Sequence, residues 1–172
     1  MSNVCYTWGT EAHPLINGNF LNNIDIIKSK YSILIIGGNI GDCYSYKYKH
    51  FISECVCRFK HVFVGAGFIE HYSGWKRGHS VEKTNAHINS ICTQLPDITF
   101  LDTINSPYSW YMDYFIASFD GRNSDAFDVE YAAKLKGKIF MILPYGSEGI
   151  RNTDLDNIII DCSIEPSLVI WV

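Results

Sequence analysis

The sequence predicts an α/β protein in which a mixed, mainly parallel β-sheet is covered by helices on its faces. Three features of the 172 residues support this class. Short runs rich in β-branched and aromatic residues alternate with segments of helical periodicity, which is typical of βαβ units. The apolar runs are continuous, as expected for strands that are buried on both faces. Hydrophobic residues make up 47% of the chain, which is sufficient for a substantial core in a single domain spanning residues 1–172.

The predicted strands are short apolar runs, most of which end at a Gly, Pro or Asp. They are VCYTW at 4–8, YSILIIGG at 31–38, HVFVGAG at 61–67, ITFLD at 98–102, KIFMILP at 138–144 and SLVIWV at 167–172. The aromatic stretch SPYSWYMDYFIASFDG at 106–121 alternates in polarity, which predicts an exposed-face antiparallel strand or hairpin. A mixed sheet system, with parallel and antiparallel pairing, follows from these patterns.

Helices are predicted where apolar residues recur three and four positions apart. The segments are SYKYKHFISECVCRF at 45–59, SVEKTNAHINSICTQL at 80–95 and SDAFDVEYAAKLKGK at 124–138. Ser80 begins the second segment and is a suitable N-cap. The third has Asp residues early and Lys residues late, which suits the helix dipole. The first two each connect two predicted strands, as parallel pairing requires.

Charge and composition exclude several classes of partner. The formal net charge is −4 and the 14 Lys and Arg residues are scattered, so the chain lacks the basic stripe that binds nucleic acid. No apolar run reaches the roughly 18 residues that span a bilayer, and the start of the chain lacks a secretory leader pattern. We therefore expect an intracellular, cytoplasmic protein with no membrane span.

The six cysteines are spread among apolar segments, which favours free, buried thiols over disulfides.

The glycine-rich loop GGNIGD at 37–42 does not match the common catalytic loops. It lacks the Lys-Ser/Thr ending of a phosphate-binding P-loop and the third glycine of a dinucleotide fingerprint. YGSEG at 145–149 lacks the spacing of a nucleophile elbow. We interpret these glycines as turn formers.

Four segments, taken in order, nevertheless resemble one enzyme family. ILIIGGNIGD at 33–42 is similar to an apolar strand ending in G-G-D-I-G-D, and RFKHVFVGAGFIEHYSG at 58–74 is similar to R-F-K-x-V-F-V-V-x-G-N-H-E-Y-Y-G. INSICTQLPDITFLD at 88–102 and IFMILPYG at 139–146 match a later helix-strand and the strand that normally ends in H-H-L-P. The family that these segments resemble is the calcineurin-like metallophosphoesterases. The resemblance covers most of the chain and implies a two-layer β-sandwich flanked by helices, with a two-metal site at the strand ends.

The resemblance also implies that this metal site is degenerate. Two-metal hydrolysis needs anionic and imidazole ligands around an activated water. Asn39 stands where the family has the metal-bridging Asp, and its neutral amide offers one carbonyl oxygen. Phe68 and Ile69 replace a metal-binding Asn and a phosphoryl-stabilising His. Met141 and Ile142 replace paired histidines, and the family's last motif, G-H-x-H, would begin after the last residue. We expect a C-terminally truncated member with no catalytic residue and no metal cofactor.

Some polar residues at the same strand ends suggest a simpler metal site as an alternative. Glu11-x-His13 has the spacing of the family's opening D-x-H motif, with a longer carboxylate. The candidate ligands all follow predicted strands, whose ends line one edge of a parallel sheet. They are Glu11, His13, Asp42, Glu70 and His71. On this alternative they hold one divalent ion such as Mn, Fe or Zn, and otherwise they are solvated loop residues.

The function predicted from these features is that of a pseudoenzyme used as a structural or protein-binding module. We expect Phe68 and Ile69 to pack into the space that the metals would have occupied. The alternative is a residual metal-dependent phosphoesterase acting on a small phosphodiester or nucleotide. Richness in Ile, Asn, Lys and Tyr is compatible with an AT-biased genome, such as those of many large DNA viruses or protists, so a virion component is one concrete case.

A docking region is predicted near the end of the chain. The strand at 167–172 would leave a sheet edge with unpaired backbone groups, and such edges recruit another strand. A homo-oligomer or a neighbouring subunit would cover it. Large aromatic side chains would act as anchors there. The predicted interface residues are Tyr108, Trp110, Tyr111, Tyr114 and Trp171.

Overall fold

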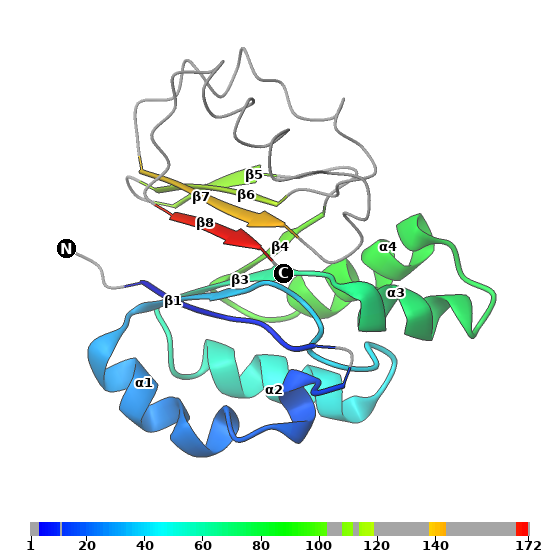
Figure 1. Cartoon of the computed structure of the whole chain (residues 1–172), viewed down its shortest axis with the longest axis horizontal. Coiled ribbons are helices and arrows are strands. Elements are labelled where there is room, and N and C mark those ends of the chain that lie inside the picture. The colour runs from blue at the N-terminus through cyan, green and yellow to red at the C-terminus, as the bar shows by residue number, and fades with distance from the viewer. Residues whose placement is uncertain are drawn as a thin grey trace, which may run out of the picture. The chain divides into compact units, whose positions relative to one another are not determined.

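A computed structural model describes most of the first hundred residues and the strands of the remainder. The described residues are 4–10, 12–102, 108–111, 114–118, 138–143 and 168–171. The chain divides into two compact units, Met1–Phe100 and Leu101–Val172, and each is treated separately below. Figure 1 shows their elements in chain order. The expectation of one domain over residues 1–172 stays a prediction.

The first sheet has the strand order β1-β2-β3-β4. Its strands are β1 (Val4–Thr7), β2 (Ile33–Ile36), β3 (His61–Gly65) and β4 (Ile98–Leu101). β1 pairs with β2 in parallel, and β2 pairs with β3 in parallel. These strands confirm the predicted runs, and their parallel pairing follows from the helices that connect them.

Among its described residues, the first unit has four α-helices in addition to its sheet. They are α1 (Ile24–Lys30), α2 (Tyr46–Val56), α3 (Phe68–Trp75) and α4 (Val81–Cys92), preceded by the short 3-10 helices η1 (Leu15–Asn17) and η2 (Leu21–Asn23). Figure 1 shows α1 and α2 on one face of the sheet, with α3 beside α4. The two helices predicted within this unit, α2 and α4, are confirmed. The Ser80 hydroxyl accepts a hydrogen bond from the Lys83 N–H, as an N-cap does.

In the core between the sheet and α2, every second side chain along a strand points towards the helix. Leu34 and Ile36 of β2 point into the cluster that contains Phe51 and Ile52 of α2. Each fully buried side chain of this size contributes about 1.5–3 kcal/mol to folding. The intervening residues of the same strands lie on the opposite face and are also buried; they include Ile33, Ile35 and Phe63. The continuous apolar runs in the sequence therefore correspond to strands that are buried on both faces.

The second unit contains another sheet, with the order β5-β6-β7-β8. The strands are β5 (Tyr108–Tyr111), β6 (Tyr114–Ser118), β7 (Lys138–Leu143) and β8 (Leu168–Trp171). β5 and β6 pair antiparallel, which confirms the predicted hairpin, whereas β6, β7 and β8 pair in parallel. The helix predicted at 124–138 lies outside the described residues.

Two helices were not predicted from the sequence. The segment that forms α3 was not assigned a helix, because it was compared with the strand-then-loop motif of the resembling family. Gly74 is in fact required inside α3, since a Cβ at that position would collide with the Thr84 hydroxyl of α4. The second missed helix, α1, has only seven residues.

Two expectations about composition can be compared with the described residues. In that part of the chain the cysteines are free: Cys43, Cys55 and Cys92 are buried, Cys5 is half-buried and Cys57 is exposed. Cys162 lies outside it. No described helix has the length and apolarity needed to cross a membrane.

Candidate functional site

The candidate site is the corner where β1, β2 and β3 of the first sheet end. It consists of Gly9 after β1, the loop 37–41 after β2, and residues 66–70, which lead into α3. Gly38 and Gly41 have positive φ angles of 106° and 156°. A Cβ on Gly38 would lie 2.5 Å from the Gly67 nitrogen, so only glycine lets these two loops approach. The interpretation of Gly38 and Gly41 as turn formers is consistent with this geometry.

The centre of the corner is the carboxylate of Glu70, which is 0% exposed. Its Oε1 accepts hydrogen bonds from the N–H groups of Ile40 at 2.7 Å and Gly41 at 3.2 Å. Its Oε2 accepts from Asn39 at 3.0 Å and Gly67 at 2.8 Å. Successive backbone N–H groups that converge in this way form an anion-binding nest. Here the anion is a side chain of the protein itself.

Burial and hydrogen bonding shift the pKa of Glu70 in opposite directions. Burial raises the pKa of the carboxyl group, because the charged form loses hydration. The backbone donors of Gly67, Gly41 and Ile40 oppose that rise by binding the anion. Glu70 also lies in the first turn of α3, where the helix dipole favours negative charge. The carboxylate therefore ties the loop after β2 to the start of α3.

Asn39 is the second buried polar residue of the corner, and its side chain connects two further segments. Its Nδ2 donates to the Gly9 carbonyl at 3.2 Å, and its Oδ1 accepts from the Ile69 N–H at 3.0 Å. Its own carbonyl accepts from the Leu15 N–H at 3.1 Å. The residue has a φ of 52°, a left-handed conformation that asparagine tolerates well. A carboxylate at this position would have no hydrogen to offer Gly9.

The structure contradicts the expected packing of Phe68. Phe68 is 37% exposed and stacks on Tyr72 of the next turn, so it does not fill an internal space, and that expectation is wrong. Ile69 is half-buried. The reason is helical geometry: α3 begins at Phe68, and its inward face is instead given to Glu70, Ser73 and Gly74.

Two of the proposed relic ligands, Asp42 and His71, have separate partners in the structure. Asp42 binds Arg77, with its Oδ2 2.9 Å from Nη2, and its Oδ1 accepts from the Tyr44 N–H. His71 Nε2 lies 3.0 Å from the Asn85 Oδ1. His13 is exposed, and Glu11 lies outside the described residues. Within the described ranges, no three His, Cys, Asp or Glu side chains are grouped as a metal site would require.

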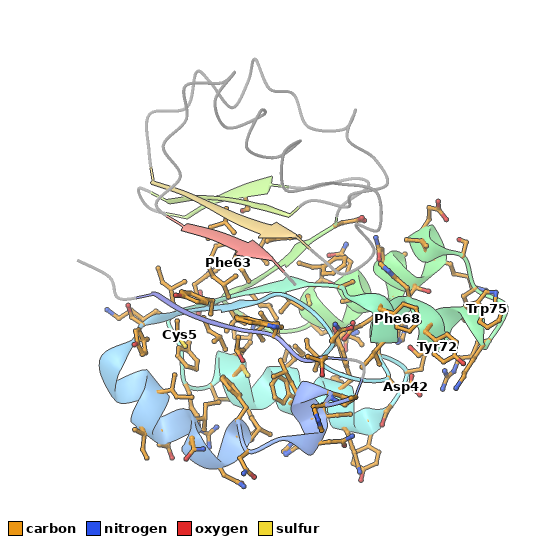
Figure 2. The ribbon with its side chains drawn as sticks, in the orientation of Figure 1. Cys5, Asp42, Phe63, Phe68, Tyr72 and Trp75 are labelled. Atoms are coloured by element: carbon orange, nitrogen blue, oxygen red, sulfur yellow. The ribbon has the colours of Figure 1, made fainter. Side chains whose placement is uncertain are left out.

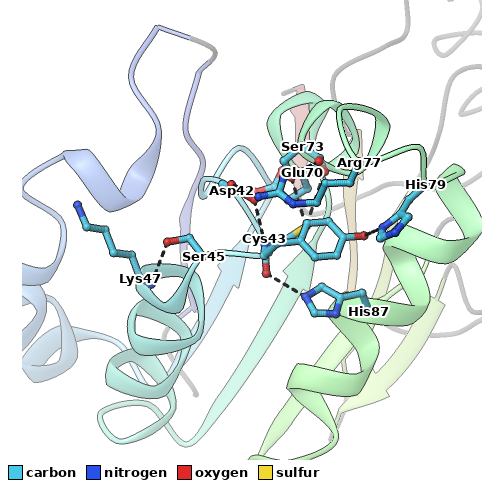
Figure 3. Close-up of polar contacts among 10 residues, drawn as sticks. Asp42, Cys43, Ser45, Lys47, Glu70, Ser73, Arg77, His79 and His87 are labelled. Carbon is cyan, nitrogen blue, oxygen red and sulfur yellow. Dashed lines mark hydrogen bonds and ion pairs between the residues drawn. The ribbon is translucent and has the colours of Figure 1, made fainter.

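Sequence reasoning missed a cluster of side chains around Tyr44, three of which, Arg77, His79 and His87, are labelled in Figure 3. The Tyr44 hydroxyl lies 2.7 Å from His79 Nδ1, and its ring stacks on His87 with centroids 4.2 Å apart. The guanidinium of Arg77 lies 4.7 Å from the same ring. Burial lowers the pKa of His79, and electrostatic interactions with Lys83, Arg77 and His87 lower it further. The sequence carried no signal of this cluster, because its members come from three separate segments.

A buried thiol also lies next to Glu70. Cys43 Sγ is 3.4 Å from the Ser73 hydroxyl, which donates to the Glu70 carbonyl at 2.7 Å. Burial raises the pKa of Cys43 to about 12. The thiol is therefore protonated near neutral pH, and Cys43 is a packing residue rather than a nucleophile.

The remaining predicted residues lie on the second sheet. Met141 and Ile142 belong to β7, and the predicted interface residues belong to β5, β6 and β8. Their side chains lie outside the description. Comparison of the chain with protein-family models, with curated protein sequences and with solved structures found no significant match.

Proposed function

We propose that this chain is a pseudoenzyme related to the calcineurin-like metallophosphoesterases, and that it works as a structural or protein-binding module. The observation that carries the proposal is the Glu70 carboxylate in its nest of four backbone N–H groups. Both oxygens of this carboxylate, which is one of the candidate metal ligands, accept hydrogen bonds from the protein's own backbone, so a metal ion would have to compete with four of them.

Asn39 supports the same proposal. On the resemblance it occupies the position of the metal-bridging Asp, yet both ends of its amide hold the backbone of neighbouring segments. The two polar groups of the corner thus stabilise its fold, and the glycine-rich loops are retained because the chain must pass close to itself there.

The experiment is a metal and activity assay on the purified protein. We expect no stoichiometric Mn, Fe, Zn or Ni by elemental analysis, and no hydrolysis of bis-p-nitrophenyl phosphate when each metal is added. His13→Ala provides the matched variant, because His13 is exposed and its loss should not disturb the corner. Bound transition ions that disappear in His13→Ala or Glu70→Ala would overturn the proposal in favour of a residual metal-dependent phosphoesterase.

A further inference from the structure

The outward side of α3 carries three aromatic side chains in a row, Phe68, Tyr72 and Trp75, which we call the α3 aromatic face. They are 37%, 40% and 70% exposed. The ring centroids of Phe68 and Tyr72 are 5.4 Å apart, and those of Tyr72 and Trp75 are 5.8 Å apart, with stacked planes in both pairs. Figure 2 shows the three side chains along one side of the helix. The spacing of four and then three residues places them on a single helical face.

From this face we infer a docking site for an acidic segment of a partner protein that also carries an apolar anchor. The inference rests on the proposed role as a protein-binding module and names its surface. Exposed aromatic groups rimmed by polar residues mark interaction sites, and Trp and Tyr are the side chains that dominate binding energy at interfaces. The face also begins at Phe68, immediately beside the Glu70 corner.

The charge of α3 determines the chemistry of the partner. Between residues 68 and 77, Glu70 is the one acidic residue in the sequence, and it is buried in the corner. Lys76 lies on the aromatic face, with its Nζ 4.4 Å from the centroid of the Tyr72 ring. Within the described part of the chain Lys76 forms no ion pair. A carboxylate of the partner would pair with this ammonium group while an apolar side chain packs on Trp75.

Two other occupants fit this surface less well. In a symmetric dimer formed through the face, each copy would bring its own Lys76 to the same patch, so like charges would meet. A nucleic acid strand could stack on the rings, but the face offers one lysine, Lys76, which is too few cations for the row of phosphates that a strand brings. An acidic protein segment satisfies both the rings and the ammonium group.

The anchoring of α3 makes the face suitable for binding. Its inward residues Glu70 and Ser73 are buried, and Glu70 is hydrogen-bonded to the loop after β2. The aromatic rings are therefore displayed from a helix that is fixed at its first turn. A preorganised surface loses less conformational entropy when a partner binds.

Selection from a displayed library of random peptides of about twelve residues tests the inference. On the wild-type protein we expect enriched peptides to combine Asp or Glu with Trp, Phe or Leu. In fluorescence anisotropy, their affinity should fall by roughly tenfold or more in Trp75→Ala and in Lys76→Glu. Tyr46→Ala is the matched control, because Tyr46 is a 78% exposed aromatic residue on another helix, and binding should be unchanged.

Several outcomes would overturn the inference. They are the absence of enriched peptides, enrichment of neutral or basic peptides, binding that is insensitive to Trp75→Ala, and preferential binding of an oligothymidine to the same face. Failure here is distinguishable from failure of the proposed function. The metal and phosphodiesterase assay does not involve the α3 aromatic face, so an inactive protein that binds no acidic peptide would remove only this docking site.

Discussion

The Glu70 carboxylate lies 2.7 Å from the backbone nitrogen of Ile40, a residue 30 positions earlier in the chain. This contact joins the loop after β2 to the first turn of α3. Because Glu70 is fully buried, its carboxylate oxygens and the N–H groups around it depend on each other for hydrogen bonding. The carboxylate therefore stabilises the corner.

Glu70→Gln should therefore destabilise the protein strongly. The amide would place an NH₂ group against N–H donors, leaving buried donors unsatisfied, and we expect a loss of about 3–5 kcal/mol in the free energy of unfolding. Urea denaturation followed by circular dichroism measures this loss. Glu54→Gln is the control, because Glu54 forms a partly exposed ion pair with Arg58 and should change stability by at most about 1 kcal/mol.

Chemical rescue by a small anion distinguishes loss of the anion from the backbone N–H nest from a non-specific destabilisation of the fold. Glu70→Ala leaves the N–H groups in place without their anion, so added formate or acetate should restore part of the lost stability. Chloride at the same ionic strength serves as the salt control. Equal stability of the wild type and Glu70→Gln, or an absence of rescue in Glu70→Ala, would contradict the role assigned to the nest.

Asn39→Asp, which introduces the acid that the resemblance expects, should also destabilise the protein. The variant loses the hydrogen bond to the Gly9 carbonyl and places a second carboxylate near Glu70. We expect a loss of about 2–4 kcal/mol near neutral pH. Backbone strain is not the cause, since Asp tolerates the left-handed conformation much as Asn does.

The pH dependence of stability in Asn39→Asp shows whether the charge of the new carboxylate causes the loss. The new carboxyl group should have a raised pKa in the folded state, so stability relative to the wild type should recover as the pH falls below about 5. A protonated carboxyl can donate to the Gly9 carbonyl, as the amide does. Thermal melts at several pH values measure the difference between variant and wild type. A difference that does not change with pH, or a variant as stable as the wild type, would contradict this account.

The sequence was informative where hydrophobicity alone determines structure. Strands such as β2 and β3 were predicted because their apolar runs are continuous, and α4 was predicted because its periodicity follows a capping residue, Ser80. In contrast, α3 was missed, although Phe68, Tyr72 and Trp75 recur at helical spacing. Comparison with a loop motif took precedence over periodicity there.

The candidate site was less predictable than the strands. Residues of the corner were identified from the resemblance, but the role of Glu70 depends on backbone N–H groups, which every residue except proline carries. No pattern of residue types can reveal such partners. The same holds for Tyr44, whose contacts His79 and His87 lie 35 and 43 positions later and meet it only through the packing of α3 and α4.

The buried hydroxyl group of Tyr48 allows the energetic cost of an unsatisfied polar group in the core to be tested. Its side chain is 0% exposed, and its hydroxyl has no hydrogen-bond partner among the described residues. Tyr48→Phe should leave stability unchanged or raise it by about 1 kcal/mol, because an unsatisfied buried hydroxyl is unfavourable. Tyr44→Phe is the matched comparison and should lower stability, since that hydroxyl is bonded to His79. Urea denaturation of both variants measures the contrast, and a substantial loss in Tyr48→Phe would indicate a partner for its hydroxyl.

The cluster around His79 predicts that acid weakens the folded state. Burial lowers the pKa of His79, and electrostatic interactions with Lys83, Arg77 and His87 lower it further. Tyr44 faces its Nδ1 from the loop before α2. Because the folded pKa lies below the ordinary value of about 6.5, the unfolded chain binds more protons once the pH falls to that value. The contribution of His79 to stability is therefore present above about pH 6.5 and is lost as the pH falls through the folded pKa.

His79→Gln removes this titration and should flatten the decline of stability between about pH 7 and pH 5. Glutamine can still accept a hydrogen bond from the Tyr44 hydroxyl, so the variant should fold. His50→Gln is the control, because His50 is exposed on α2 and its substitution should leave the pH profile unchanged. Urea denaturation across this pH range gives each profile. If His79→Gln shows the same decline as the wild type while His50→Gln removes it, the acid sensitivity belongs to the surface of α2 and not to the Tyr44 cluster.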